Sequence, residues 1–380
     1  MASKMPVYWH DSFLEHEAPG GGWVIPKTDL HEVFHDCPER PERVENVKRG
    51  IESALADWAS WEPVEGASWE QIERVHDPGY VEAMRRRFCE EGGGYVLHDG
   101  ETGLTGGNEG TCEALQMAAG AAVQSAETAV ETDVDTVPFA PVRPPGHHAL
   151  SDEADGFCIF NNVAVAAEHV ISEGVVENVA IVDWDVHHGN GTQEIFYDRD
   201  DVLTVNLHYN HGRLAEWHTQ TGHPDEMGVG AGEGYSVNAL LPHGTGNEGY
   251  ARAFDEIVEP VVAEFDPDLL LVSNGLDPGR YDPIGRNVVT KPGFVEMGRR
   301  TRNLAKTHAD GSLGVILEGG YNISHLPFAN LGVFEGLLDV DTGIEDPYDF
   351  EEFHNENMGV VEDWLDDARK ELSSHWNLAS

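Results

Sequence analysis

From about residue 110 onward, short apolar runs alternate with longer segments of helical pattern, and this alternation limits the fold more than any other feature. Strands that alternate with helices form a parallel sheet with helices on both faces. The strands are expected at residues 137–142, 179–182, 202–207, 269–273 and 313–317. The helices are expected at 112–130, 161–171, 248–265, 294–308 and 360–372. The sequence therefore predicts an α/β fold.

Polar side chains follow several of the predicted strands, at the point where each strand ends. In an open parallel sheet, ligands bind beyond the carboxyl ends of the strands, and the sheet brings these ends together whatever their separation in the sequence. The side chains gathered in this way would be His147, His148, Asp185, His187, Asp277 and Tyr321. This edge of the sheet is the expected functional site.

Asp185 and His187 are two residues apart on an extended segment, so their side chains point in the same direction. With Asp277 they would give a metal ion three protein ligands and leave one position open, which is typical of a catalytic metal site. Two carboxylates cancel the charge of a divalent ion, so such a metal acidifies its water only moderately. The chemistry then also needs a base and a donor to the developing oxyanion.

The sequence supplies candidates for both of these functions. His147 and His148 follow a rigid Pro-Pro-Gly turn and can act as general base and acid. Asp183 and Asn190 flank the ligand pair and can accept the imidazole N–H groups. Tyr321, which two glycines precede, can donate a hydrogen bond to an oxyanion.

Each of these motifs has an ordinary interpretation when it occurs alone. A His-His pair usually lies on the surface, Glu-Gly-Gly-Tyr usually forms a turn, and an Asp at a strand end often caps the next helix. Their joint occurrence at successive strand ends favours a catalytic site. His208, His211 and His218 lack such support, and we interpret them as ordinary polar or rim residues.

The net charge of −46 is unusual in its sign, because charged residues make up an ordinary 24% of the chain. Acidic residues are spread among apolar segments, which indicates a folded protein with an acidic surface, as expected in a halophile. The same charge argues against nucleic acid or an anionic membrane as a direct partner.

The cysteines, Cys37, Cys89, Cys112 and Cys158, form no Cys-x-x-Cys pair, so neither a disulfide scaffold nor a thiolate zinc site is expected. The amino-terminal residues contain no apolar region of the signal-peptide type, and no apolar run approaches the length of a membrane span. We therefore expect a cytoplasmic protein.

Four longer motifs together resemble the histone deacetylase superfamily. They are PPGHHA at 144–149, GFCIFNN at 156–162, VDWDVHHGNGTQ at 182–193 and LEGGYN at 317–322. The NGTQ ending of the third motif is similar to class II enzymes and to bacterial histone deacetylase-like amidohydrolases. The similarity runs from about residue 5 to 350 and includes PERPER at 38–43 and DPY at 346–348.

The resemblance implies a three-layer arginase/deacetylase-like fold with a mainly parallel eight-stranded sheet, in a single catalytic domain over residues 1–380. The catalytic motifs would occupy 141–325, and the acidic segment from about 341 to 380 would be peripheral. The implied activity is zinc-dependent hydrolysis of N-acyl amides by metal-bound water, and in particular deacetylation of acetyl-lysine.

The resemblance also implies a role for each residue of the site. Zn²⁺ would be bound by Asp185, His187 and Asp277. His148 would be the main proton-transfer residue, paired with Asn190. His147, paired with Asp183, would assist electrostatically. Tyr321 would polarise the acyl carbonyl.

A substrate channel and a second cation site are further implications. The channel would be lined by Gly156, Phe157, Gly319 and Gly320. A structural K⁺ would lie near Asp183, Asp185, His187, Asn206 and Leu207, mostly on main-chain oxygens.

Some positions depart from the family pattern. Cys37 precedes Pro38 where a histidine is frequent, and Asn206 replaces a small hydroxyl residue beside the K⁺ site. The second channel wall lacks its phenylalanine, for which Trp217 is a candidate substitute. The carboxylate that grips the substrate backbone would be Asp99 or Glu101.

Several alternatives stay open at the level of sequence. The substrate would be acetyl-lysine, an acetylpolyamine or another small acylated amine. An arginase-like enzyme with two manganese ions is disfavoured, because Gly189 and Gly275 stand where further carboxylate ligands would be needed. A non-catalytic acyl-binding scaffold is disfavoured, because no catalytic residue is lost. The native metal and the oligomeric state, including a homo-oligomer, are not determined by these residues.

The acidic composition predicts that the protein is more stable in concentrated salt. The screening length falls from about 10 Å at 0.1 M salt to about 3 Å at 1 M, which suppresses self-repulsion among the acidic residues. We expect the thermal midpoint to rise between 0.1 M and 2 M KCl, as measured by circular dichroism. A midpoint that does not change with KCl would contradict this interpretation.

Overall fold

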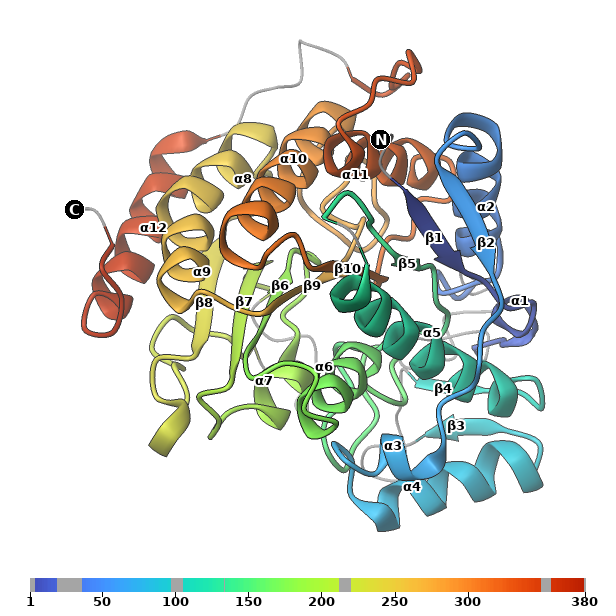
Figure 1. Cartoon of the computed structure of the whole chain (residues 1–380). Coiled ribbons are helices and arrows are strands. Elements are labelled where there is room, and N and C mark those ends of the chain that lie inside the picture. Colours follow the sequence, from blue (N-terminus) through green and yellow to red (C-terminus); the bar gives the residue numbers. More distant parts are fainter. Residues whose placement is uncertain are drawn as a thin grey trace, which may run out of the picture.

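The central sheet of the computed structural model is parallel throughout and, among the described residues, has eight strands. The structure describes residues 4–18, 36–96, 105–132, 134–211, 220–349 and 357–378. The strand order is β2-β1-β5-β10-β9-β6-β7-β8, seen from right to left in Figure 1. The strands are β1 Met5–Tyr8, β2 Ala59–Glu62, β5 Phe139–Ala140, β6 Val179–Asp183, β7 Val202–Tyr209, β8 Ser236–Leu241, β9 Leu269–Asn274 and β10 Leu313–Leu317. The predicted sheet is thus confirmed.

Helices cover both faces of this sheet. In Figure 1, α2, α8, α10 and α11 lie on one side of the sheet, and α5, α6 and α7 lie on the other. The helices are α1 Ser12–Glu15, α2 Glu42–Ala54, α3 Trp69–Ile72, α4 Pro78–Arg85, α5 Thr111–Glu131, α6 Asn162–Ser172, α7 Asn190–Ile195, α8 Asn247–Ala253, α9 Glu259–Phe265, α10 Lys291–His308, α11 Leu326–Leu338 and α12 Met358–Leu372. The shorter elements are η1 Arg86–Glu90, η2 Gly230–Gly232, η3 Phe254–Val258 and the hairpin strands β3 Gly94–Val96 and β4 Thr105–Gly107.

The central strands β6, β9 and β10 are buried at every residue. Because helices cover both faces, these strands are nearly continuous apolar runs instead of alternating patterns. At the end of β6, Asp183 is paired in register with Asn206 of β7 and Ser273 of β9. The carboxyl ends of the three strands therefore meet at one edge of the sheet.

Two predicted elements differ from the observed ones in extent. The strand expected at 137–142 is only the two residues of β5, because Pro138 and Pro141 flank it and cannot donate to the sheet ladder. The helix expected at 248–265 is divided into α8, the π-helical η3 and α9. Pro260 lies in the first turn of α9 and lacks the N–H that an unbroken helix would need.

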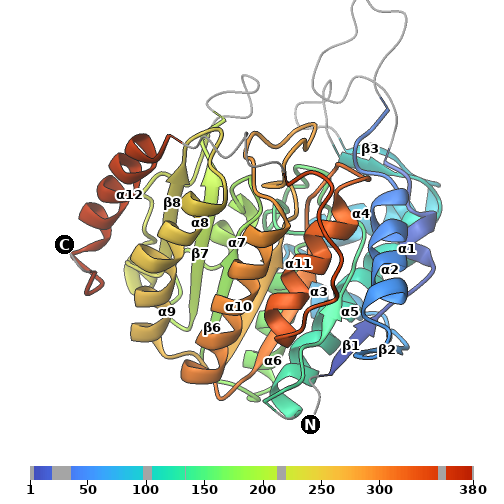
Figure 2. The same ribbon diagram turned by 90° about the horizontal axis from the view of Figure 1, so that it is seen from above.

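The carboxyl-terminal segment closes one edge of the sheet. Helix α12 lies beside β8 in Figures 1 and 2, and its buried residues are Val361, Leu365, Ala368 and Leu372. Their spacing of three or four residues places them on one helix face. Beyond the helix, the indole of Trp376 donates a hydrogen bond to the Gly234 carbonyl (2.8 Å). The segment described above as peripheral thus contributes apolar side chains to the core.

The cysteine prediction is wrong in one respect. Cys89 of η1 and Cys112 of α5 form a disulfide bond across 23 residues of sequence. Cys37 and Cys158 are free and buried. The spacing of the cysteines does not predict this pair, because the packing of η1 against α5 brings the two residues together.

Membrane spanning is not indicated in the described part of the chain, where no helix has the length and apolar character that a bilayer requires.

The packing of α12 yields a stability prediction. Leu365 is fully buried, so Leu365→Ala should lower the free energy of unfolding by about 2–5 kcal/mol. Asp363→Ala on the exposed face of the same helix should change it by less than about 0.5 kcal/mol. Denaturant unfolding in molar KCl measures both values. Equal effects of the two substitutions would show that α12 does not stabilise the sheet edge.

Candidate metal and catalytic site

Three ionisable side chains converge at the carboxyl edge of the sheet. Suitable ligand atoms of Asp185, His187 and Asp277 all lie within 4.8 Å of one another. Asp185 and His187 follow β6, and Asp277 follows β9, its neighbour in the sheet. The sequence analysis named the same three residues as metal ligands. They form the one such group found among the described residues.

Backbone N–H groups fix the orientation of both carboxylates. Gly319 N–H donates to Asp185 Oδ2 (2.8 Å), and Val186 N–H donates to Asp277 Oδ1 (2.9 Å). The remaining oxygens face His187, whose Nδ1 is 3.2 Å from Asp185 Oδ1 and 3.1 Å from Asp277 Oδ2. Asp185 Oδ1 also accepts the backbone N–H of His187 (3.0 Å), so backbone donors hold both carboxylates in place while one oxygen of each faces the imidazole.

The electrostatics of this cluster favour a cation. Burial, together with the neighbouring Asp185 carboxylate, raises the pKa of Asp277 to about 7. Burial opposes a charge on His187, but its hydrogen bonds to the two carboxylates raise its pKa well above the usual value. Two buried carboxylates and an imidazole are a donor set of the kind that binds Zn²⁺ or a similar divalent ion. The residues present thus fit a divalent metal.

Two glycines leave room for the cluster. A side chain at Gly275 would place its Cβ 2.4 Å from Asp185 Oδ2, and one at Gly189 would place its Cβ 2.5 Å from Asp183 Oδ2. These contacts are too short for any non-hydrogen atom. The positions where an arginase-like site would need further carboxylates are therefore sterically closed here.

His147 and His148 lie side by side, with ring centroids 4.0 Å apart. The Nδ1–H of His147 donates to Asp183 Oδ2 (2.9 Å), and the Nδ1–H of His148 donates to Asn190 Oδ1 (2.7 Å). A carboxylate and an amide carbonyl oxygen can only accept, so both Nδ1 atoms carry the proton. The expected pairings are thus present.

The two imidazoles are electrostatically different. Burial opposes a charge on His147, but the carboxylates of Asp185 and Asp183 raise its pKa to about 10. Burial and the positive charges of His147 and His187 lower the pKa of His148 well below the usual value. One ring is therefore cationic while its neighbour is neutral, with its Nε2 lone pair available to accept a proton.

Tyr321 follows directly after the Gly-Gly turn at the end of β10. Gly320 has φ +115°, which a residue with a side chain rarely adopts. The tyrosine ring packs against Phe157, with centroids 5.8 Å apart, and the guanidinium of Arg43 is 4.6 Å from its centroid. Burial raises the pKa of Tyr321, so its hydroxyl remains protonated and can donate.

Gly156 and Phe157, the predicted channel wall, lie next to the histidine pair. Both have positive φ, +49° and +71°. A Cβ at Gly156 would come 2.2 Å from His148 Cδ2, so only glycine allows the chain to approach the ring this closely. Cys37 packs with Phe157 and Tyr321 in a small apolar cluster separate from the main core.

The sequence analysis assigned no role to a buried charged group behind this site. Arg43 donates to the main-chain oxygens of Gly320 (2.5 Å) and Glu318 (2.6 Å), and to the carboxylate of Glu39 (3.0 Å). The same Glu39 oxygen accepts from Arg143 Nε (2.6 Å). The sequence analysis could have noticed Arg43 and Glu39 as charged residues within the PERPER motif. Only the fold, however, determines which backbone groups they bind.

Glu318 is a second residue without an assigned role. Its Oε2 accepts the N–H groups of Gly146 (2.7 Å) and His147 (3.1 Å), and its side chain is fully buried. Burial raises its pKa to about 7. The carboxylate therefore holds the turn that carries both histidines.

The residues expected around K⁺ lie at and just after the end of β6 and within the neighbouring strand β7. Asn206 is opposite Asp183 in the sheet, and its Oδ1 accepts the N–H of Gly189 (3.3 Å). Leu207 is fully buried on β7. His208, interpreted above as a polar or rim residue, is instead completely buried, and its Nε2 is 3.1 Å from the Gly222 carbonyl oxygen. Asp99, Glu101, Trp217 and His218 lie outside the described residues.

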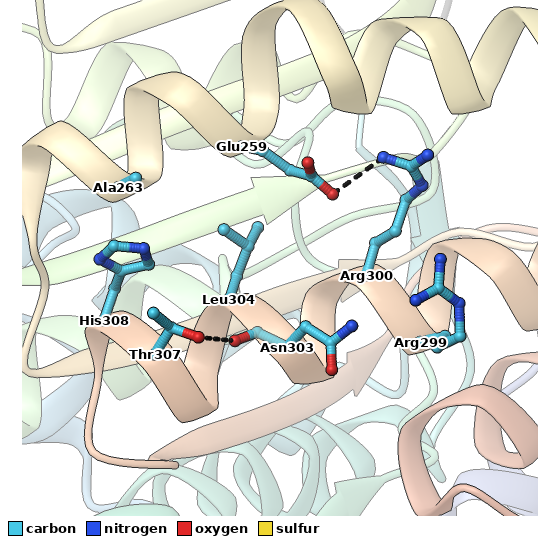
Figure 3. A pocket seen from close by; sticks show the side chains of 8 residues that line it. All are labelled: Glu259, Ala263, Arg299, Arg300, Asn303, Leu304, Thr307 and His308. Carbon is cyan, nitrogen blue, oxygen red and sulfur yellow. Dashed lines mark hydrogen bonds and ion pairs between the residues drawn. The ribbon is translucent and has the colours of Figure 1, made fainter.

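A separate groove of about 410 Å³ lies between α9 and α10 (Figure 3). It is lined by Glu259, Ala263, Arg299, Arg300, Asn303, Leu304, Thr307 and His308. Arg300 is paired with Asp255, Glu259 and Glu296. The groove contains none of the residues that converge at the strand ends.

The fold and the site define the class of this protein: an α/β protein whose parallel sheet gathers a metal-binding triad and a histidine pair at its carboxyl edge. The histone deacetylase domain family matches residues 37–337. The chain belongs to the histone deacetylase family, and it is therefore a hydrolase of the deacetylase and amidohydrolase type.

Individual relatives cover nearly the whole chain. The histone deacetylase-like amidohydrolase of Pseudomonas aeruginosa is 34% identical, over 100% of this chain and 97% of the relative. The probable deacetylase of Archaeoglobus fulgidus is 35% identical, over 90% of this chain and 89% of the relative. The crystal structure of the HDA15 HD domain superposes with a TM-score of 0.81 at 30% identity, covering 98% of this chain and 95% of that one.

The ligand triad yields a metal-binding prediction. After chelator treatment, the wild-type chain should bind about one Zn²⁺, and Asp277→Asn should bind it at least about tenfold more weakly, because the carboxylate charge is lost. Isothermal titration calorimetry measures both affinities. Asp268→Asn, at the opposite end of β9, is the control and should bind like wild type. Unchanged affinity in Asp277→Asn would exclude this residue as a ligand.

Proposed function

We propose that the protein is a zinc-dependent deacetylase that hydrolyses the N-acyl amide of acetyl-lysine. The observation that carries the proposal is the pair of imidazoles beside the triad, one held on a carboxylate (2.9 Å) and the other on an amide oxygen (2.7 Å). Nearby carboxylates raise the pKa of His147, whereas burial and neighbouring positive charges lower the pKa of His148, a short distance from a metal-binding group. Such paired and opposed shifts are typical of acid–base catalysis.

Asp185, His187 and Asp277 would hold the metal. When bound, a divalent ion supplies Lewis-acid polarisation of the scissile carbonyl and lowers the pKa of a water molecule. Gly319 N–H and Val186 N–H orient the two carboxylates, and the carboxylates in turn contact the His187 ring. Little reorganisation would then be needed on binding.

His148 would move the proton. Its neutral Nε2 accepts a proton from the attacking water and then delivers it to the amide nitrogen as the carbon–nitrogen bond breaks, leaving a carboxylate and a free amine. Asn190 keeps the ring in the required tautomer through Nδ1 (2.7 Å). His147, cationic on Asp183, would stabilise the negative charge that develops beside it.

Tyr321 would donate its hydroxyl hydrogen bond to the carbonyl oxygen as negative charge develops there. Its raised pKa keeps it protonated for this purpose, and its ring is held between Phe157 and the Arg43 guanidinium. The acyl chain would pass along Gly156 and Phe157, with Gly319 and Gly320 on the opposite side. A Cβ at Gly319 would come 2.4 Å from Asp277 Oδ2 and 2.5 Å from Asp185 Oδ2, so the glycine there leaves room for the triad.

A second element of the proposal is a structural K⁺. It would lie near Asp183, Asp185, His187, Asn206 and Leu207. Asn206 Oδ1 is engaged by Gly189 N–H (3.3 Å), and its Nδ2 is a buried donor that could not bind a cation. The Asn206 side chain is therefore a poor ligand as placed. The ion would have to rest mainly on main-chain oxygens and on Asp183.

The test is the hydrolysis of a fluorogenic acetyl-lysine peptide in molar KCl. Tyr321→Phe should lower kcat by about 10²–10³, because one oxyanion donor is lost, and His148→Ala should lower it by at least about 10². Metal content should stay near that of wild type in both variants. Tyr197→Phe, which removes a tyrosine hydroxyl outside the site, is the matched control.

Two outcomes would contradict the proposal. Full activity in Tyr321→Phe and His148→Ala would exclude the assigned roles. A folded, metal-loaded wild type without activity would exclude acetyl-lysine as the substrate, and acetylated polyamines would then be assayed in the same way.

A further inference from the structure

The carboxylate of Asp282, in the loop between β9 and α10, accepts four backbone N–H groups from two different loops. Its Oδ1 accepts from Ile284 (3.0 Å) and Gly285 (2.8 Å) of its own loop. Its Oδ2 accepts from Tyr321 (2.7 Å) and Asn322 (3.3 Å) of the loop after β10. The side chain is buried, so water does not compete for these N–H groups.

A second hydrogen bond ties the same two loops together. Asn322 Nδ2 donates to the main-chain oxygen of Tyr281 (3.1 Å). Tyr281 has φ +66°, a left-handed conformation that is unfavourable for a bulky side chain, and the residue is 54% exposed. Such strain persists only where the surroundings over-determine the backbone. The left-handed bend at Tyr281 directly precedes the buried Asp282.

The two loops joined by Asp282 carry different parts of the proposed machinery. The loop after β9 carries Asp277, and Gly285 packs so closely on it that a Cβ there would be 2.1 Å from the Asp277 carbonyl oxygen. The loop after β10 carries Tyr321. Asp282 is therefore one link between the loop of a triad ligand and the loop of the residue assigned to the oxyanion, in addition to the hydrogen bond from Leu276 N–H to the Gly319 carbonyl oxygen (3.0 Å).

The loop after β10 is gripped from two sides by opposite charges. Arg43 binds its main-chain oxygens at Glu318 and Gly320, and Asp282 binds its N–H groups at Tyr321 and Asn322. The cationic Arg43 thus donates to the carbonyl oxygens of the loop, and the anionic Asp282 accepts from its N–H groups. Charge-assisted hydrogen bonds of this kind are stronger than neutral ones. They therefore restrict the backbone of the loop that carries Tyr321.

We propose that Asp282 is a positioning residue that sets the distance between the Tyr321 hydroxyl and the metal-binding triad. The inference rests on the proposed function, because it assumes that Tyr321 acts on the substrate. Asp282 itself touches no reacting atom. Its effect on the reaction is transmitted through the backbone of residues 321 and 322.

The principal test is Asp282→Asn, which keeps the shape of the side chain. An amide has one carbonyl oxygen, and its NH₂ group cannot accept, so one pair of backbone N–H groups loses its acceptor. With the acetyl-lysine peptide, kcat should fall by about tenfold to a hundredfold, as expected for a displacement near 1 Å. KM and the metal content should stay within about twofold of wild type, a split that general loss of structure would not produce.

A double-mutant cycle separates positioning from other effects. In the Tyr321→Phe background there is no hydroxyl to displace, so Asp282→Asn should lower kcat by less than about threefold. An equal loss in the presence and absence of the hydroxyl would overturn the inference. If Tyr321→Phe alone retains wild-type activity, the proposed function fails instead, so the two failures are distinguishable.

A second variant covers the case in which Asp282→Asn does not fold. Asn322→Asp keeps the oxygen that accepts from Ser324 and His325 at the start of α11 but removes the donor to Tyr281. It should also lower kcat, and again less so without the Tyr321 hydroxyl. Equal losses in the two backgrounds, or no loss in either, would contradict the link between the loops.

The matched control is Asp268→Asn. Asp268 Oδ2 likewise joins two segments by accepting two N–H groups, from Glu177 (2.7 Å) and Asn178 (3.0 Å), but at the opposite end of β9. It should leave kcat and KM unchanged. If Asp268→Asn lowered kcat as much as Asp282→Asn, any carboxylate that joins two backbone segments would affect the reaction. The specific role assigned to Asp282 would then be excluded.

Discussion

Two buried carboxylates, Asp185 and Asp277, face a single imidazole at the edge of the sheet, and the site depends on this concentration of charge. Burying ionised groups is costly unless they are paired or bind a metal. Here both carboxylates accept backbone N–H groups, and one oxygen of each faces the His187 imidazole. The positions of the two carboxylates are thus fixed, and their negative charges are only partly compensated by the imidazole. Such a cluster is suited to bind a divalent cation.

The surrounding backbone is fixed by further buried charges. Glu318 holds the histidine turn, Arg43 holds the carbonyls of the tyrosine loop, and Asp282 holds its amides. Catalytic geometry on loops needs such support, because loops lack the regular hydrogen bonds of helices and strands. The site of this deacetylase family member is therefore held by charged side chains as much as by its sheet.

The predictability of the fold follows from how each element is buried. Strands β6, β9 and β10 were located within about one residue, since burial on both faces gives them continuous apolar runs. β1 and β2, which have four residues each, were not located from the sequence, nor was β8, in which Ser236 and Asn238 interrupt the apolar run. The disulfide Cys89–Cys112 and the closure of the β8 edge by α12 were likewise beyond a sequence pattern, since both are contacts between distant segments.

The sequence by itself determined the residue types of the site and their family: the triad, the histidine pair and Tyr321 each lie in a local motif whose spacing is a property of the chain. The tertiary structure decided how these motifs are oriented. It made one imidazole cationic by placing two carboxylates beside it, and the other neutral by burying it next to positively charged rings. It also selected Arg43, Glu318 and Asp282 as supports. The physical reason is that burial and hydrogen-bond partners come from strands and loops far apart in the sequence, so no local pattern records them.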